Sequence, residues 1–296
     1  MLPEQEGRDP TVTQRVDPER IMHGHPDRPG DRLKAVILCG GQGTRLREET
    51  EYRPKPLVPI GNRPILWHIM RTYAAFGVTD FILALGYKGE MIKDYFLNYD
   101  LWNSDFTLHL GSKRIEPLTP SVDGAGWTVT FVDTGLATAT GGRLKRLEPY
   151  LRGEGRFMLT YGDGVSDVDL DALLHFHDRS GCDVTVTGVR PLARFGELIV
   201  RDERVVRFAE KPAGGDAWIN GGYFVMTPAI FDAIPGDSTS LEVEPLERMA
   251  RDQRLAVYRH DGYWQCMDTF REMQLLNEQW TAGVPPWVRH WHRAAA

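Results

Sequence analysis

The chain has 296 residues, of which 42% are hydrophobic and 26% charged, so it is long enough for one large α/β domain with or without a smaller appended part. The sequence contains no run of about 18 apolar residues, which argues against a membrane span and favours a soluble protein. The formal net charge of −6 argues against nucleic acid as the main partner, because nucleic-acid-binding proteins usually carry basic surfaces.

The N-terminal segment, residues 1–33, is rich in proline, aspartate, arginine and glycine and lacks the apolar stretch of a secretory signal, so we expect a flexible arm. The three cysteines, Cys39, Cys182 and Cys266, are far apart and show no Cys-x-x-Cys spacing. This pattern predicts neither a disulfide framework nor a structural zinc site. A reducing, cytoplasmic location is therefore expected.

Regular structure is predicted to begin at Lys34, where an apolar run is typical of a buried strand that ends in glycines. Apolar residues then recur at helical spacing after Pro64, which suits the first turn of a helix. The elements expected in this half are strands at 35–38, 80–85, 105–110 and 127–132, helices at 65–73 and 91–96, and a loop at 113–126.

The second half continues the alternation and then becomes richer in strands. The elements expected here are helices at 140–151 and 170–176, a strand at 157–160, a strand-rich stretch at 182–225, and helices near 246 and 270. Alternating strands and helices predict an α/β fold with a mainly parallel sheet and helices on both faces. Such sheets bind ligands at the carboxyl ends of their strands.

A glycine-rich turn follows the first predicted strand, in residues 38–46. Glycines allow backbone N–H groups to approach phosphate oxygens closely, and Thr44 and Arg45 add a hydroxyl and a cation. Leu46 stands where a dinucleotide-binding turn needs glycine or alanine, and the segment lacks the Gly-Lys of a Walker loop, so neither a dehydrogenase nor a P-loop ATPase is favoured. A tight turn without function remains the alternative.

Lys55 lies between Pro54 and Pro56, which stiffen its backbone while its ammonium group stays free to meet an anion. This arrangement suits phosphate binding. A surface loop is the alternative interpretation of such a segment.

Asp163 follows a predicted buried strand and is flanked by Gly162 and Gly164, which leave room for a ligand. Asp268 precedes a predicted helix. Magnesium prefers one or two carboxylates together with phosphate oxygens and water, so these two residues are candidate metal ligands. The alternatives are a turn residue at Asp163 and a helix cap at Asp268.

Taken together, these motifs and several others resemble one family over roughly residues 34–287. The chain is similar to the sugar-1-phosphate nucleotidylyltransferases, and within them to the glucose-1-phosphate cytidylyltransferases. The matching segments are the strand and glycine loop at 35–45, Lys55-Pro56, residues 64–70, Asp133-Thr134-Gly135, residues 140–146, residues 161–164, Glu210-Lys211-Pro212, Asn220-Gly221-Gly222 and Met267-Asp268-Thr269.

The resemblance implies a Rossmann-like, doubly wound, mainly parallel mixed sheet with a smaller strand-rich acceptor subdomain. It implies one domain over 34–296, with a nucleotide-binding part at 34–181 and a sugar-phosphate-binding part at 182–296. Residues implied to bind the nucleotide in the first part are Leu38, Cys39, Gly40, Gly41, Gln42, Gly43, Thr44, Arg45, Lys55 and Gly162.

Further roles are implied by the same resemblance. Asp163 and Asp268 would hold Mg²⁺. The sugar phosphate would meet Glu210, Lys211, Asn220 and Gly221, and the catalytic set would be Arg45, Lys55, Asp163 and Lys211. The expected activity joins a nucleoside triphosphate to a sugar 1-phosphate and releases pyrophosphate.

The cytidylyl branch is suggested by residues 140–143, with Thr138 just before them; Thr138, Gly142 and Arg143 are the candidates for contact with the base. A helix start capped by Thr140 is the alternative. The segment 136–139 is less polar than expected for glucose-specific relatives, and Glu197 stands where a small residue is common, so the identity of the sugar stays open.

Mechanism also follows from charge. The second pKa of a sugar phosphate is about 6, so the acceptor attacks as an anion at neutral pH and needs no general base. The alternatives that remain are the same reaction with dTTP, UTP, ATP or GTP, another sugar or cyclitol phosphate, and a regulatory homologue without turnover. The resemblance also implies a homo-oligomer.

Overall fold

The computed structural model describes residues 33–119, 124, 126–190, 197–201, 204–209 and 217–292. The described residues belong to one compact unit. Apart from Leu33, the arm expected at 1–33 lies outside the described residues. Within the described part of the chain, no helix has the length and apolar character needed to cross a membrane.

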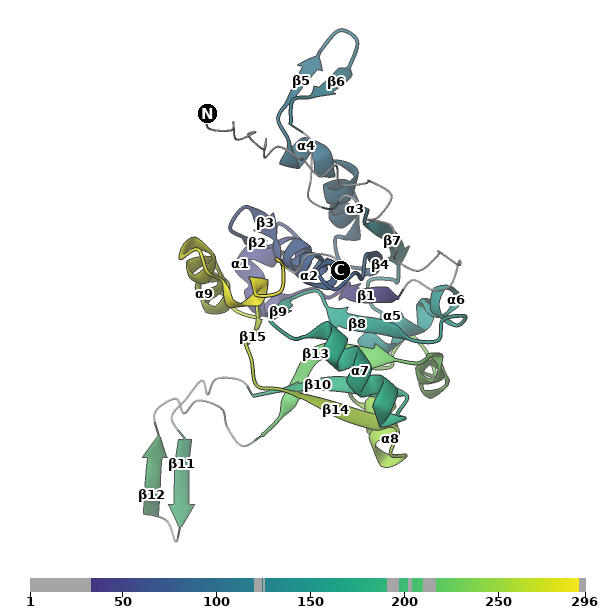
Figure 1. Ribbon diagram of the computed structural model, residues 1–296, viewed down its shortest axis with the longest axis vertical. Helices are drawn as coiled ribbons and strands as arrows, with labels where there is room; N and C mark the ends of the chain where they lie inside the picture. The colour runs from purple at the N-terminus through teal and green to yellow at the C-terminus, as the bar shows by residue number, and fades with distance from the viewer. Residues whose placement is uncertain are drawn as a thin grey trace, which may run out of the picture. The chain divides into compact units, whose positions relative to one another are not determined.

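One large sheet organises this unit (Figure 1). Neighbouring strands in space come from distant parts of the chain, so the sheet is built by crossovers. In spatial order its seven strands among the described residues are β14 (Leu255–His260), β10 (Val184–Val189), β13 (Ile219–Met226), β8 (Phe157–Tyr161), β1 (Lys34–Cys39), β4 (Asp80–Leu85) and β7 (Thr128–Asp133).

The sheet is mainly parallel. β1 pairs in parallel with both β4 and β8, β4 pairs in parallel with β7, and β10 pairs in parallel with β14. β13 pairs antiparallel with β10 and with β8, so it runs against the other six strands of this sheet. The predicted α/β fold with a mainly parallel mixed sheet is confirmed.

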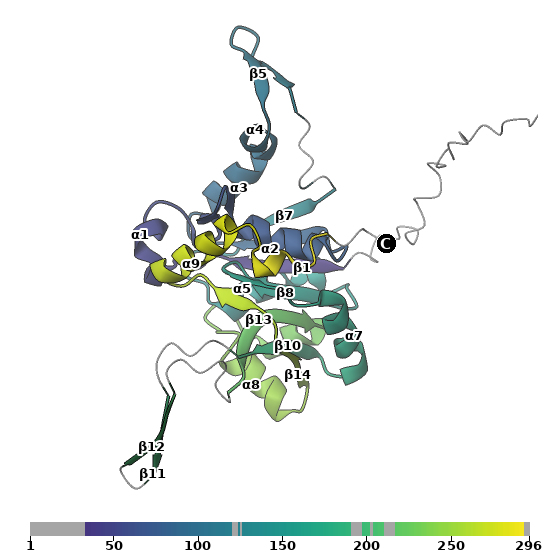
Figure 2. The ribbon, with the colours of Figure 1, turned by 60° about the vertical axis from the view of Figure 1, so that its left-hand side comes forward.

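Both faces of the sheet are buried, as a doubly wound fold requires. Along β1, Ala35, Ile37 and Cys39 belong to one core cluster, whereas Val36 and Leu38 belong to the other. Residues of α2 (Ile65–Ala74), α7 (Leu170–Ser180) and α9 (Phe270–Thr281) pack in the first cluster, and Figure 2 shows α9 lying close to α2. Residues of α5 (Thr140–Arg146), α8 (Glu244–Arg251) and η4 (Pro228–Ala233) pack in the second.

The remaining elements are short. The helices are α1 (Arg47–Thr50), α3 (Gly89–Leu97), α4 (Tyr99–Asn103) and α6 (Glu148–Leu151), with 3₁₀ turns η2 (Thr44–Leu46), η3 (Lys55–Leu57) and η5 (Pro286–Val288). The two-stranded pairs are β2 (Pro59–Ile60) with β3 (Arg63–Pro64), β5 (Phe106–His109) with β6 (Arg114–Pro117), β9 (Gly164–Ser166) with β15 (Trp264–Cys266), and β11 (Glu197–Arg201) with β12 (Arg204–Ala209).

The β5–β6 pair corrects one expectation, because Arg114–Pro117 was predicted to lie in a loop. Its four residues include one large apolar side chain and a terminal proline, so the alternation that marks a strand is missing. Its strand conformation comes from pairing with β5, which local sequence does not record. The division at residue 181 stays a prediction, while β10, β13 and β14 join the same sheet as β1.

Candidate active site

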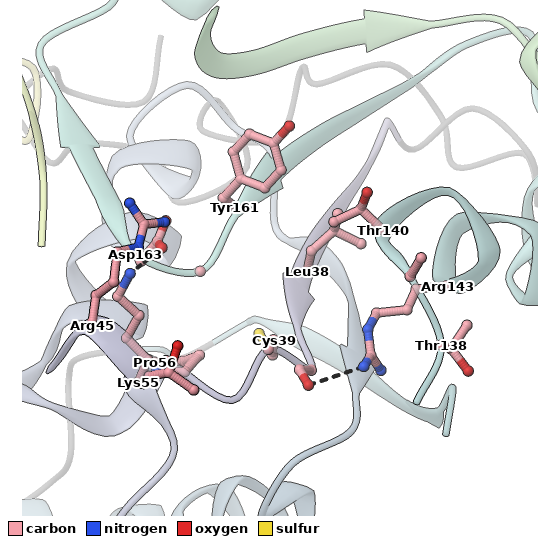
Figure 3. Close-up of a pocket in the computed structure, with 16 residues that line it drawn as sticks. Leu38, Cys39, Arg45, Lys55, Pro56, Thr138, Thr140, Arg143, Tyr161 and Asp163 are labelled. Carbon is pink, nitrogen blue, oxygen red and sulfur yellow. Dashed lines mark hydrogen bonds and ion pairs between the residues drawn. The ribbon is translucent and has the colours of Figure 1, made fainter. Parts of the chain in front are cut away.

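A cavity of about 380 Å³ opens at the edge of the sheet where β1 and β8 end (Figure 3). The residues that line it are Leu38, Cys39, Gly40, Gly41, Gly43, Thr44, Arg45, Lys55, Pro56, Thr138, Ala139, Thr140, Arg143, Tyr161, Gly162 and Asp163. Figure 3 shows Arg45, Lys55 and Asp163 on one side and Thr138, Thr140 and Arg143 on the other, with Cys39 between them.

Most residues expected to bind the nucleotide therefore surround one space. Gln42 and Gly142, both described, lie outside this lining. A Cβ atom at Gly142 would stand 2.3 Å from the carbonyl oxygen of Asp237, so the close approach of that segment requires glycine there. A role of Gly142 in base recognition remains a prediction.

The glycine loop is held in a conformation that only glycine adopts easily. Gly43 has φ = 63°, in the left-handed region, and a Cβ atom there would stand 2.7 Å from the side chain of Thr50. The hydroxyl of Thr50 donates to the Gly43 carbonyl oxygen at 3.1 Å. Contacts with Thr50 thus hold the loop in place beside the cavity.

A cluster of two cations and two carboxylates occupies one end of the cavity. The Lys55 ammonium lies 2.6 Å from Oδ2 of Asp163 and 2.5 Å from Oδ1 of Asp268. The Arg45 guanidinium lies 2.6 Å from Oδ2 of Asp268. Burial alone would lower the pKa of Lys55, but the two carboxylates outweigh it and hold that pKa above its ordinary value, so the ammonium stays charged.

The backbone explains why two aspartates so distant in sequence meet. β9 begins directly after Asp163, β15 ends just before Met267, and these two strands pair antiparallel. The Met267 N–H also donates to the Asp163 carbonyl oxygen at 2.8 Å. This pairing places Asp268 beside the carboxyl end of β8.

The N-cap residue of α9 is Thr269, not Asp268. The Thr269 hydroxyl accepts from the Glu272 N–H at 3.3 Å, while the Glu272 carboxylate accepts from the Asp268 and Thr269 N–H groups. This is a capping box that needs no side-chain oxygen from Asp268. The alternative of a helix cap at Asp268 is therefore wrong, and its carboxylate faces the cations instead.

Arg143 connects two loops and the end of a strand at the other end of the cavity. Arg143 is 4% exposed, and its guanidinium donates to oxygens of the loops that follow β1 and β7 and of the last residue of β4. The acceptors are the carbonyl oxygens of Gly40 at 3.0 Å, Leu85 at 3.0 Å, Gly135 at 2.7 Å and Leu136 at 3.3 Å, and the hydroxyl of Thr134 at 2.8 Å. Arg143 thus fixes the glycine loop.

At the start of α5, the side chain of Thr140 does not cap the helix. The residue at the cap position is Ala139, and no side chain caps the helix. The Thr140 hydroxyl instead donates to Oε2 of Glu242 at 2.7 Å and accepts from the Leu241 N–H at 2.9 Å. A helix does begin at Thr140, but a cap by Thr140 is wrong, because its hydroxyl binds a segment about a hundred residues away in the chain.

Comparison with known proteins shows the family to which the chain belongs. The family model described as nucleotidyl transferase matches residues 34–272, which is most of the chain. The chain belongs to the nucleotidyl transferase family. It is 48% identical to the glucose-1-phosphate cytidylyltransferase of Salmonella typhimurium over 255 residues, which cover 86% of this chain and 98% of that protein. It is 44% identical to a protein named probable glucose-1-phosphate cytidylyltransferase from Bacillus subtilis, over 86% of this chain and 99% of the relative.

Solved structures support the fold of this nucleotidyl transferase. HddC from Yersinia pseudotuberculosis superposes with a TM-score of 0.61 at 23% identity and covers 84% of this chain and 99% of its own. A UDP-glucose pyrophosphorylase complexed with UDP-glucose gives a TM-score of 0.62 at 17% identity, over 85% of this chain and 99% of its own.

Asp163 and Asp268 are the residues of this nucleotidyl transferase that could hold a divalent cation. Their oxygens already converge on one positive charge, the Lys55 ammonium. The described residues contain no group of three or more His, Cys, Asp or Glu side chains placed to hold a metal. Two carboxylates are the donor set of an ion that completes its shell with phosphate oxygens and water, as Mg²⁺ does.

The acceptor side is described in part. Glu210 and Lys211 lie outside the described residues. Asn220 and Gly221 are the second and third residues of β13, and the Asn220 amide nitrogen donates to the Tyr161 hydroxyl at 3.2 Å. Sequence reasoning missed Tyr161 and Glu242, although the position of Tyr161 between a buried strand and Gly162 was a usable signal.

Proposed function

We propose that this chain transfers a cytidylyl group from CTP to glucose 1-phosphate, giving CDP-glucose and pyrophosphate with Mg²⁺. The observation that carries the proposal is the meeting of Lys55, Asp163 and Asp268 beside the glycine loop. The 48% identity to a glucose-1-phosphate cytidylyltransferase over 86% of this chain supports the choice of substrates.

The reaction is an in-line displacement at phosphorus. An oxygen of the sugar phosphate forms a bond to the α-phosphorus of CTP, and the bond from that phosphorus to the bridging oxygen of the β-phosphate breaks. Pyrophosphate leaves with the electron pair. The acceptor is already anionic at neutral pH, so positioning and charge neutralisation supply the acceleration.

The cation and carboxylate cluster suits these needs. Asp163 and Asp268 would hold Mg²⁺, which when bound polarises the α-phosphate. Arg45, whose side chain is 73% exposed, can turn from Asp268 to the triphosphate. Lys55 would stabilise the charge that builds on the leaving pyrophosphate.

The glycine loop holds the triphosphate in this proposal. Backbone N–H groups of residues 40–43 contact phosphate oxygens, and Arg143 keeps the loop in place through the Gly40 carbonyl oxygen. Thr138, which is 9% exposed and lines the cavity, stands at the end expected to meet the base. Selection of cytosine is assigned to this end.

The acceptor would lie beside β13. We assign the sugar phosphate to Asn220, Gly221, Lys211 and Glu210, with Lys211 orienting the incoming phosphate by its charge. Asn220 is exposed and lies next to Tyr161, a cavity residue, so a sugar placed there reaches the nucleotide.

The deciding experiment measures pyrophosphate release with Mg²⁺, glucose 1-phosphate and each of CTP, UTP, dTTP, ATP and GTP. We expect turnover with CTP. Turnover with another triphosphate would keep the reaction and change the base, and a panel of sugar and cyclitol phosphates would test the acceptor in the same way. Absence of turnover with every pair would favour a regulatory homologue.

Two further expectations accompany the proposal. A cytoplasmic location is supported by the three cysteines, which are free thiols in the structure. A homo-oligomer is expected from the family resemblance, and light scattering of the purified protein measures it.

A further inference from the structure

Glu242 lies just behind the cavity wall and joins two of its residues. Its Oε1 accepts from the Tyr161 hydroxyl at 2.6 Å, and its Oε2 accepts from the hydroxyls of Thr140 and Ser240, both at 2.7 Å. Tyr161 and Thr140 line the cavity, and they come from the end of β8 and the start of α5. One carboxylate therefore joins the end of β8 to the start of α5 in the cavity wall.

The carboxylate is held in its charged form. Burial raises the pKa of Glu242, but hydrogen bonds from Tyr161, Thr140 and Ser240 outweigh burial and keep that pKa below its ordinary value. An ionised carboxylate only accepts hydrogen bonds. The Tyr161 hydroxyl must therefore donate its single proton to Glu242.

The fixed direction of the Tyr161 hydroxyl also orients the side chain of Asn220. Because the Tyr161 proton is committed, its oxygen can only accept, and it accepts from the Asn220 amide nitrogen at 3.2 Å. The Asn220 amide oxygen accepts from the Gly222 N–H at 2.8 Å. Both ends of the Asn220 amide are thus oriented, and each keeps a further hydrogen-bonding position for a ligand.

We propose that Glu242 is a positioning residue for the acceptor, which fixes Tyr161 and, through Tyr161, orients Asn220 toward the sugar 1-phosphate. The inference rests on the proposed function, because that function assigns Asn220 to the acceptor. Glu242 acts through other residues and need not touch substrate itself.

Steady-state kinetics with CTP, glucose 1-phosphate and Mg²⁺ test this role in Glu242→Gln. The amide retains the size of the side chain, but its NH₂ group opposes a hydroxyl donor. We expect KM for glucose 1-phosphate to rise at least about tenfold while KM for CTP changes less than about twofold. Glu244→Gln is the matched control, since Glu244 is exposed at the start of α8 two residues away, and it should behave as wild type.

Tyr161→Phe provides a second variant that keeps the ring and removes the hydroxyl between Glu242 and Asn220. It should raise the same KM, and the double variant should add little to either single one. Equal increases in both KM values, or a Glu242→Gln enzyme with wild-type kinetics, would overturn the inference, because a merely structural role does not select the acceptor.

A measurement without substrate separates this inference from the proposed function. If wild type turns over no substrate pair, the proposed function fails. Urea unfolding of wild type, Glu242→Gln, Tyr161→Phe and the double variant then tests whether Glu242 and Tyr161 are coupled. Non-additive free energies of unfolding would support the link between the two residues. Additive values would contradict it.

Discussion

The Lys55 ammonium lies 2.6 Å from Asp163 and bridges this residue to Asp268. It stands where two carboxylates converge, which is the position that a divalent cation would need. Without a ligand, Lys55 and Arg45 neutralise these carboxylates themselves. A bound triphosphate offers both cations other anionic partners, so metal and nucleotide should bind together more tightly than either binds alone.

Replacement of Lys55 tests this competition directly. In Lys55→Met, the carboxylates lose the ammonium between them, so the affinity for Mn²⁺ in the absence of nucleotide should rise at least about tenfold. Isothermal titration calorimetry with MnCl₂ measures this affinity. Lys34→Met is the control, because Lys34 pairs with Glu154 at 2.7 Å away from this cluster. Unchanged or weaker Mn²⁺ binding in Lys55→Met would show that the ammonium does not hold the place of the metal.

Loss of the Asp163 charge should affect turnover. Asp163→Asn keeps the shape of the side chain and removes the charge of one of the two carboxylates proposed to hold Mg²⁺, so we expect kcat to fall at least about a hundredfold, the loss typical of one key electrostatic group. Pyrophosphate release at saturating Mg²⁺ measures it. Asp178→Asn serves as control, since Asp178 pairs with Arg156 on the surface. Activity near that of wild type would remove Asp163 from the mechanism.

The same cluster shows how far sequence reasoning reaches. β1, β4 and α2 are predicted well, because each carries a regular apolar pattern, and the glycine loop and Asp163 follow a buried strand that signals a ligand-binding edge. The pairing of β9 with β15 carries no such pattern. Its three-residue strands meet only because the whole fold brings them together.

Side-chain direction is the other part that sequence cannot supply. Arg143 lies in a short helix, where its chemistry suggests contact with a base, yet its guanidinium donates to protein oxygens of two loops and of the end of β4. Glu242 and Glu244 are identical residues just before Pro245, and local sequence does not tell them apart. Only the packing of their segment against Thr140 and Tyr161 selects Glu242.

Replacement of Arg143 tests whether this residue anchors the glycine loop or contacts the base directly. Arg143→Lys cannot reach all the oxygens that the guanidinium contacts, and each buried acceptor left unpaired costs about 1–3 kcal/mol. We expect a lower free energy of unfolding in urea and a weaker affinity for all triphosphates alike, because the glycine loop loses its anchor. Arg146→Lys, in an exposed pair with Asp237, should change little. A change confined to the preference for CTP would instead support direct contact with the base.

His68 should make stability depend on pH. It is fully buried against Trp280 and Trp287, at ring distances of 4.7 and 5.9 Å, and its Nδ1 accepts from the Trp287 indole at 3.3 Å. Burial lowers the pKa of His68 to about 4, from an ordinary value of 6.5. As pH falls from about 6.5 to about 4, His68 binds a proton in the unfolded chain but stays neutral in the folded protein. The free energy of unfolding therefore falls by an amount on the order of 3 kcal/mol.

Urea unfolding of wild type and His68→Gln at several pH values between 7.5 and 4.5 isolates this contribution. The variant should be less stable at neutral pH, because it loses a packed ring, but its free energy of unfolding should fall less steeply with acid than that of wild type. Parallel profiles for wild type and His68→Gln would mean that His68 takes up its proton equally well in the folded and unfolded states, contrary to its burial among tryptophans.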